Sequence, residues 1–187
     1  MNHISLAHYF WRRHLRFGDT AIDATCGNGN DTLVLAQCCL TPNTGKVFGI
    51  DIQSEAIAAT HLKLRKNLDE MLLQRVQLYE ISHAPLPDEL PKAHLIVYNL
   101  GYLPGGDKNI TTLSETSILS LESSLEKLHS GGMLSITLYP GHEQGEKEAK
   151  TIFEWAVQLP QELYCLSHHY RIHRLHSPSL LLIKKLF

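Results

Sequence analysis

The chain has 187 residues, of which 43% are hydrophobic and 19% charged, and its formal net charge is -2. These values are typical of one globular domain with a sizeable core, and they argue against a protein that binds nucleic acid through overall positive charge. No apolar run is long enough to cross a bilayer, and the first residues lack a signal-peptide pattern, so we expect a cytoplasmic protein. The four cysteines have no CxxC spacing, which favours buried thiols over disulfides, and we expect no metal site.

Strand-like and helix-like segments alternate along the chain. Residues 3–17 mix apolar and basic positions, which predicts an amphipathic helix that packs on the sheet and exposes Arg12 and Arg13. The expected strands are 20–22, 46–51, 76–79, 93–98, 133–139, 163–172 and 179–185. The expected helices cover 33–40, 54–68, a segment that Gly131 and Gly132 end, and 146–159. This order predicts a single α/β domain over residues 1–187, with a doubly wound, mostly parallel seven-stranded sheet and helices on both faces.

A glycine-rich stretch follows the first expected strand, Asp-Ala-Thr-Cys-Gly-Asn-Gly-Asn-Asp-Thr at 23–32. Gly27 and Gly29 allow positive φ and close approach of a ligand to backbone N–H groups at the start of the next helix. The second strand ends at Asp51, where a carboxylate can bond both hydroxyls of a ribose. The pattern predicts a nucleoside-cofactor site, to which the polar residues of the loop contribute: Asn28, Asn30 and Asp31.

The identity of the cofactor depends on two positions. The dinucleotide fingerprint has a third glycine where this chain has Thr32, which disfavours NAD and FAD. Asp23, at the end of the first strand, instead suits the ammonium group of S-adenosylmethionine (SAM), and this pattern is typical of Rossmann-like class I methyltransferases.

The second chemical stretch is Asn99-Leu-Gly-Tyr-Leu-Pro-Gly-Gly-Asp-Lys108, which follows the apolar run 93–98. In a doubly wound sheet this loop faces the first one, so it is placed to present the methyl acceptor. Ser82 and His83 follow the third strand, at a corner where adenine is expected, and His142 follows the fifth.

Together with Asp-Ile-Gln at 51–53, Thr111-Thr112 and Gly-His at 141–142, these stretches resemble the MnmM (YtqB-like) family of bacterial SAM-dependent tRNA methyltransferases, also described as rRNA methylases. The resemblance implies SAM as cofactor, tRNA (its anticodon region) as partner, and methylation of the aminomethyl nitrogen of 5-aminomethyl-2-thiouridine at the wobble position. It also leaves room for a homodimer.

Site residues follow from the motifs and the resemblance. The expected SAM contacts are Asp23, Gly27, Asn28, Gly29, Asn30, Asp31, Thr32, Asp51, Ile52, Gln53, Ser82, His83, Asn99 and Leu100. The expected RNA contacts are Gly101, Tyr102, Pro104, Gly105, Lys108, Thr112, Arg12 and Arg13. The acceptor amine must lose a proton, and the candidate bases are Asp107, Tyr102 and His142.

Three alternatives stay open at this point. The acceptor could belong to rRNA or to a small amine, since the same loops would serve. An NAD-dependent oxidoreductase is disfavoured by Thr32, and a non-catalytic RNA-binding module by the acidic net charge.

Overall fold

In the computed structural model, which describes residues 2–100, 114–174 and 176–187, seven strands form one sheet in the order β3-β2-β1-β4-β5-β7-β6. The strands are β1 (Thr20–Asp23), β2 (Lys46–Asp51), β3 (Val76–Glu80), β4 (Ala93–Asn99), β5 (Leu128–Leu138), β6 (Tyr164–His169) and β7 (Ser179–Lys185). Pairs within β3-β2-β1-β4-β5 are parallel, whereas β7 runs antiparallel to β5 and β6. The predicted doubly wound, mostly parallel sheet is confirmed.

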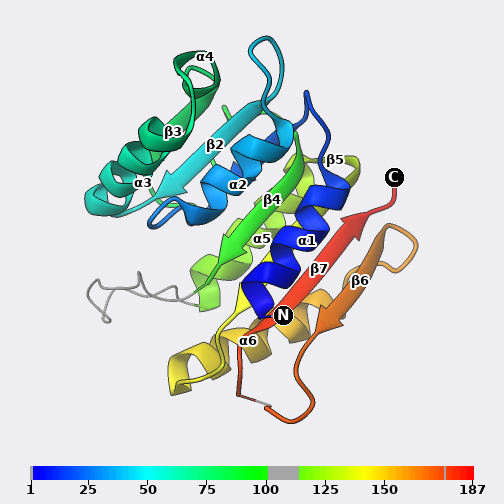
Figure 1. Ribbon diagram of the computed structural model, residues 1–187. Helices are drawn as coiled ribbons and strands as arrows, with labels where there is room; N and C mark the ends of the chain where they lie inside the picture. The colour runs from blue at the N-terminus through cyan, green and yellow to red at the C-terminus, as the bar shows by residue number, and fades with distance from the viewer. Residues whose placement is uncertain (1, 101–113, 175) are drawn as a thin grey trace.

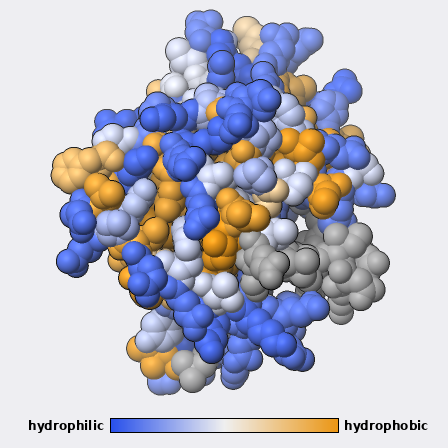
Figure 2. All heavy atoms as spheres, turned by 180° about the vertical axis from the view of Figure 1, so that it is seen from behind, coloured by the Kyte–Doolittle hydropathy of each residue, from blue (hydrophilic) through white to orange (hydrophobic). Residues whose placement is uncertain are grey.

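Helices cover both faces of this sheet. They are α1 (His3–His14), α2 (Asn30–Cys39), α3 (Ser54–Asn67), α4 (Glu70–Leu73), α5 (Ser114–Lys127) and α6 (Glu143–Ala156). In Figure 1, α1 and α2 lie in front of the sheet and α5 and α6 lie behind it. Seen from behind, hydrophilic side chains cover much of the surface, and the apolar ones form separate groups (Figure 2).

The core is divided by the sheet into two clusters, because successive residues of a strand point to opposite faces. On β4, Leu95 and Val97 join the cluster under α1 and α2, whereas Ile96 and Tyr98 join the one under α5 and α6. The apolar run of β4 is therefore buried on both faces, as its sequence predicts for a central parallel strand.

The largest difference from the predicted boundaries lies between α5 and β5. Gly131 and Gly132 do not end a helix, since α5 ends at Lys127 and β5 begins at the fully buried Leu128. The glycines instead lie within β5, where the pairing with β4 shifts between Ala93 and Leu95. A Cβ at Gly132 would lie 2.9 Å from the carbonyl oxygen of His129, so the shift requires a residue without a side chain.

Another expectation fails at the sheet edge. Cys26 and Cys39 are buried free thiols, as expected, but Cys165 is an exposed free thiol on β6. Because β6 is an edge strand, alternate residues such as Cys165 face away from the core.

Helix α1 is attached to the sheet by a buried polar contact as well as by apolar packing. Trp11 is 1% exposed, and its Nε1–H donates to the hydroxyl of Ser135 on β5 at 2.8 Å. Asn2 caps the helix by accepting from the backbone N–H of Ser5 at 2.7 Å. The helix starts at the edge where β2 and β4 end, and it runs toward the opposite edge (Figure 1).

Replacing Trp11 by Phe should lower the free energy of unfolding by about 1–3 kcal/mol, because it leaves the buried Ser135 hydroxyl without its donor. Urea denaturation measures this change. In the Trp11→Phe/Ser135→Ala double variant the loss should be smaller than the sum of the two single losses. Strictly additive losses would show that the bond does not contribute.

Candidate active site

Three polar residues meet at one edge of the sheet because the central strands are parallel. Asp23 ends β1, Asp51 ends β2 and Asn99 ends β4, and β1 pairs with both other strands in register. The loop between β1 and α2 crosses this edge, so backbone N–H groups at the start of α2 face the same space. The three strand ends that the sequence predicts for the cofactor site therefore lie at one edge.

The glycine loop has the positive φ angles that its sequence predicts, 50° at Gly27 and 72° at Gly29. A Cβ at Gly29 would lie 2.7 Å from Cα of Thr60 on α3, so this glycine permits close helix packing. Thr60 also donates its hydroxyl to the carbonyl oxygen of Gly27 at 3.0 Å. Close packing against α3 is thus a further reason for glycine at this position, beside the positive φ and the ligand approach that the sequence predicts.

Asp51 is held by the loop that it faces. The backbone N–H of Gly27 donates to one carboxylate oxygen at 2.9 Å, and that of Gln53 donates to the other at 3.0 Å. Each carboxylate oxygen keeps further acceptor capacity, and the residue is half-buried. The neighbouring Ile52 side chain is 62% exposed. A carboxylate beside an exposed apolar surface fits a ribose diol and the base attached to it.

Asp23 lies deeper, with 1% of its surface exposed. Its carboxylate accepts from the Thr32 hydroxyl at 2.6 Å and from the backbone N–H of Thr25 at 3.3 Å. Burial, and then the nearby Asp31, raise the pKa of Asp23 to about 7. Thr32, where the dinucleotide fingerprint has glycine, thus binds a buried carboxylate, which the motif alone does not indicate.

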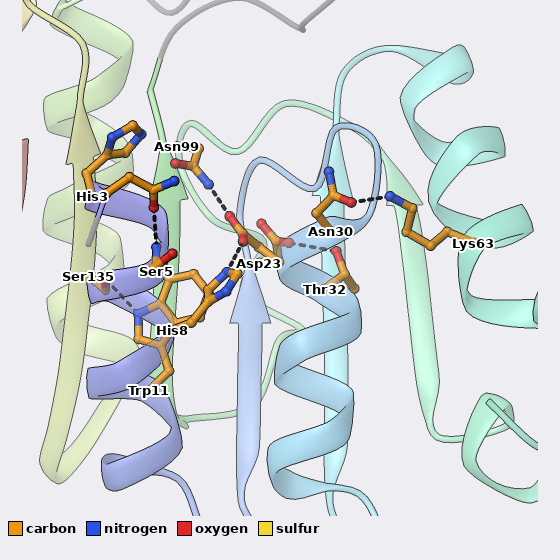
Figure 3. A network of polar contacts seen from close by, with 12 residues as sticks. His3, Ser5, His8, Trp11, Asp23, Asn30, Thr32, Lys63, Asn99 and Ser135 are labelled. Atoms are coloured by element: carbon orange, nitrogen blue, oxygen red, sulfur yellow. Dashed lines mark hydrogen bonds and ion pairs between the residues drawn. The ribbon is translucent and has the colours of Figure 1, made fainter. Parts of the chain in front are cut away.

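Asp31, at the start of α2, connects two further elements. One carboxylate oxygen lies 2.6 Å from Nε2 of His8 on α1, and the other accepts from the side-chain amide of Asn99. His8 and Asn99 approach the start of α2 from two sides (Figure 3). The hydroxyl of Tyr139 donates to Oδ1 of Asn99 at 3.3 Å and lies 3.3 Å from Nε2 of His3.

His3 and His8 were not among the predicted site residues, because the polar residues of an amphipathic helix are expected on its solvent-facing side. One signal was present: His8 precedes the buried Trp11 by three residues, and residues at this spacing share a helix face. By contrast, Arg12 and Arg13 are exposed in the last turn of α1. They adjoin His14, which contacts the carbonyl oxygen of His94 at the start of β4, so they lie toward the opposite edge.

The other predicted cofactor contacts that the structure describes range from exposed to buried side chains. Asn30 accepts from Nζ of Lys63 on α3 (Figure 3), and the half-buried Asn28 lies between the two glycines. Ser82 is exposed and accepts from the backbone N–H of Ala84 at 3.2 Å. The His83 ring lies edge-on to Tyr98, and burial lowers its pKa. Leu100 is buried beside the site.

His142 is the N-cap of α6, and its Nδ1 accepts from the backbone N–H of Gly145 at 3.1 Å. The predicted residues of the acceptor loop lie outside the described part of the chain: Gly101, Tyr102, Pro104, Gly105, Asp107, Lys108 and Thr112. Among the described residues there is no cluster of three or more potential metal ligands. No helix within these ranges is long and apolar enough to cross a membrane.

Comparison with known proteins identifies the family. Residues 47–185 match the family model described as "Putative rRNA methylase". The chain belongs to this rRNA methylase family.

Similar proteins support the assignment. A crystal structure of a Clostridium thermocellum protein described as a putative rRNA-methylase is 34% identical, with a TM-score of 0.92, and the match covers 99% of this chain and 98% of that one. A putative methyltransferase from Streptococcus mutans, solved in complex with SAH, is 30% identical, with a TM-score of 0.86 and coverage of 100% and 99%.

The chloroplastic tRNA (mnm(5)s(2)U34)-methyltransferase of Arabidopsis thaliana is 35% identical over 161 residues. This match covers 83% of the present chain and 59% of the Arabidopsis protein, so the chain spans somewhat more than half of that relative.

Replacing Asp23 by Asn should make stability less dependent on pH. Because the folded pKa is raised above the unfolded value of 3.8 to about 7, wild-type stability from this group falls as pH rises between these values. The free energy of unfolding of the variant, relative to wild type, should therefore increase by on the order of 1–3 kcal/mol from acidic pH to about pH 8.

Urea denaturation across this pH range measures the trend. A pH-independent loss is expected in addition, since the new amide cannot accept from both Thr25 and Thr32. Replacing the exposed Asp88 by Asn controls for the removal of one negative charge. A constant difference between Asp23→Asn and wild type at every pH would contradict the raised pKa.

Proposed function

We propose that this chain is a SAM-dependent RNA methyltransferase, and that it methylates the aminomethyl nitrogen of 5-aminomethyl-2-thiouridine at the tRNA wobble position. Membership of the rRNA methylase family and the SAH-bound Streptococcus relative support the methyltransferase activity and the cofactor. The name of the Arabidopsis relative supports tRNA as the substrate.

The observation that carries the proposal is the crowding of carboxylates around the glycine loop. Asp23, Asp31 and Asp51 all lie there, and the other two carboxylates both raise the pKa of Asp23. The pyrophosphate of a dinucleotide would bring two more negative charges into this field, whereas the sulfonium and ammonium of SAM outweigh its one carboxylate and leave a net positive charge. The charge distribution therefore favours SAM over NAD, in agreement with Thr32 at the third glycine position.

Three residues at the ends of β1 and β2 would each contact a different part of SAM. Asp51 would accept from the ribose hydroxyls, and Ile52 would cover one side of the base. Asp23 would face the ammonium group from below the loop. SAM supplies an already activated methyl group, so the protein needs no nucleophile, and its contribution is alignment of the acceptor.

Asn99 is the described residue best placed to orient the acceptor amine. Its Oδ1 accepts from the Tyr139 hydroxyl and has a second acceptor position for an amine hydrogen. Burial raises the pKa of Tyr139 to about 12, so its phenol stays protonated and acts as a donor rather than a base. Asp107, Tyr102 and His142 stay predictions as proton acceptors, although the role of His142 Nδ1 as a helix cap engages one of its two ring nitrogens.

Contacts with RNA stay predictions from the sequence. Lys108 would bind phosphate and Tyr102 would stack on a base, with the loop residues Gly101, Pro104, Gly105 and Thr112 shaping the acceptor pocket. Arg12 and Arg13, near the opposite edge, would contact RNA that extends around α1. The family description favours rRNA as a second candidate acceptor. Dimerisation also stays a prediction.

Replacing Asp51 by Asn should weaken SAM binding by about 10- to 100-fold, because a hydrogen bond to a charged group contributes roughly 1.5–3 kcal/mol. Isothermal titration calorimetry measures the affinity. The Asp88→Ala variant, which removes an exposed carboxylate before β4, should bind SAM like wild type. Equal affinity in wild type and Asp51→Asn would show that the ribose does not bind at the end of β2.

The acceptor is tested by incubating the protein with labelled SAM and tRNA from a strain that lacks this modification. Nucleoside mass spectrometry should show 5-aminomethyl-2-thiouridine converted to its methylamino form. Tight SAM binding without transfer to this tRNA, but with transfer to rRNA, would replace the proposed acceptor by the second candidate.

A further inference from the structure

The side chains of α1 reach the active-site edge and contact the residues that hold Asn99. His8 lies in the second turn of α1 and contacts Asp31, and His3, in the first turn, contacts Tyr139. These contacts join α1, α2, β4 and the end of β5, which are far apart in sequence. None of the predicted roles includes His3 or His8.

Both carboxylate oxygens of Asp31 bind groups of the protein itself. The residue is 8% exposed, and its two carboxylate oxygens accept separately from His8 and from Asn99. The His8 ring is held in turn by Trp11, whose ring centroid lies 4.9 Å away. The contacts of Asp31 therefore connect α1 to the end of β4, and we assign it this structural role in preference to a cofactor contact.

This connection determines which way the Asn99 amide points. With Nδ2 donating to the carboxylate, a flip of the amide would bring Oδ1 against an Asp31 oxygen, and two acceptors would face each other. The Tyr139 hydroxyl favours the same orientation from the other side, since it donates to Oδ1. Oδ1 is therefore presented as an acceptor, and a hydrogen of an incoming amine can bind to its remaining position.

We propose that His8 and Asp31 are positioning residues, which fix the Asn99 amide so that Oδ1 accepts a hydrogen from the amine to be methylated. The identity of the amine as the methyl acceptor rests on the proposed function. The orientation of the Asn99 amide does not, because it depends only on contacts within the protein. The proposal also gives α1 a role in the reaction: the helix carries His8 to the active site, and Trp11 secures the helix against β5.

The test compares two histidines of α1 that each contact an atom of another element through Nε2. His8→Ala removes the Asp31 contact, whereas His14→Ala removes the contact with the His94 carbonyl oxygen near the opposite edge. His8→Ala should lower kcat by about 10- to 100-fold, because small displacements of an aligned acceptor are costly. Its affinity for SAM should stay within about twofold of wild type, since cofactor contacts are unchanged, and His14→Ala should keep the wild-type kcat.

Asp31 provides a second comparison. Asp31→Ala should also lower kcat, and Asp31→Asn should recover part of the loss, because its amide oxygen can still accept from Nδ2 of Asn99. If Asp31→Ala instead lowers SAM affinity and leaves kcat unchanged, Asp31 is a cofactor contact and the proposal is wrong. Equal kcat values for His8→Ala and His14→Ala would also overturn it.

A readout that needs no substrate separates this proposal from the proposed function. In 15N-labelled protein, the side-chain NH2 of Asn99, assigned by its loss in Asn99→Ser, should exchange slowly with solvent in wild type and in His14→Ala. Exchange should become faster in His8→Ala and in Asp31→Ala. Wild-type protein that shows this protection but methylates neither tRNA nor rRNA would contradict the proposed function alone, whereas unchanged protection in both variants would contradict the positioning role.

Discussion

The structure depends on the hydrogen bonding of β1 to β2 on one side and to β4 on the other, in parallel register. Because all three strands run the same way, Asp23, Asp51 and Asn99 emerge at one edge, and the chain must leave that edge through the glycine loop and α2. The left-handed φ of Gly29 and the close approach of Thr60 then fix the loop against α3. The shape of the site is thus a consequence of sheet order.

Repulsion among the carboxylates of the site lowers the stability of the protein when no ligand is bound. A buried carboxylate whose pKa is raised by burial and by two neighbouring carboxylates stabilises the fold less when ionised. The same negative charge suits a cationic cofactor, and groups with shifted pKa values of this kind are common at functional sites. Thr32 and the N–H of Thr25 hold Asp23 in place, so its position is fixed before any cofactor binds.

Most of the fold could be predicted from the sequence, because periodicity and turn residues report local structure. The apolar run at 93–98 and the Asp51 strand end both lie as expected. What the sequence did not indicate concerns long-range packing: Gly131 and Gly132 serve a shift in strand pairing, and Gly29 also allows α3 to pack closely against the loop. The direction of α1 across the sheet depends on contacts with β4 and β5, which are remote in sequence. This direction brings His8, and not Arg12, to the edge where Asp31 lies.

The central claim is that this edge of the sheet aligns an aminomethyl nitrogen with the methyl group of SAM. A crystal structure with SAH and an anticodon stem-loop that contains 5-aminomethyl-2-thiouridine tests it most directly. We expect the ribose hydroxyls at Asp51 and the amine nitrogen within about 2.7–3.2 Å of Oδ1 of Asn99. An amine held elsewhere, with SAH bound away from Asp51, would contradict this account.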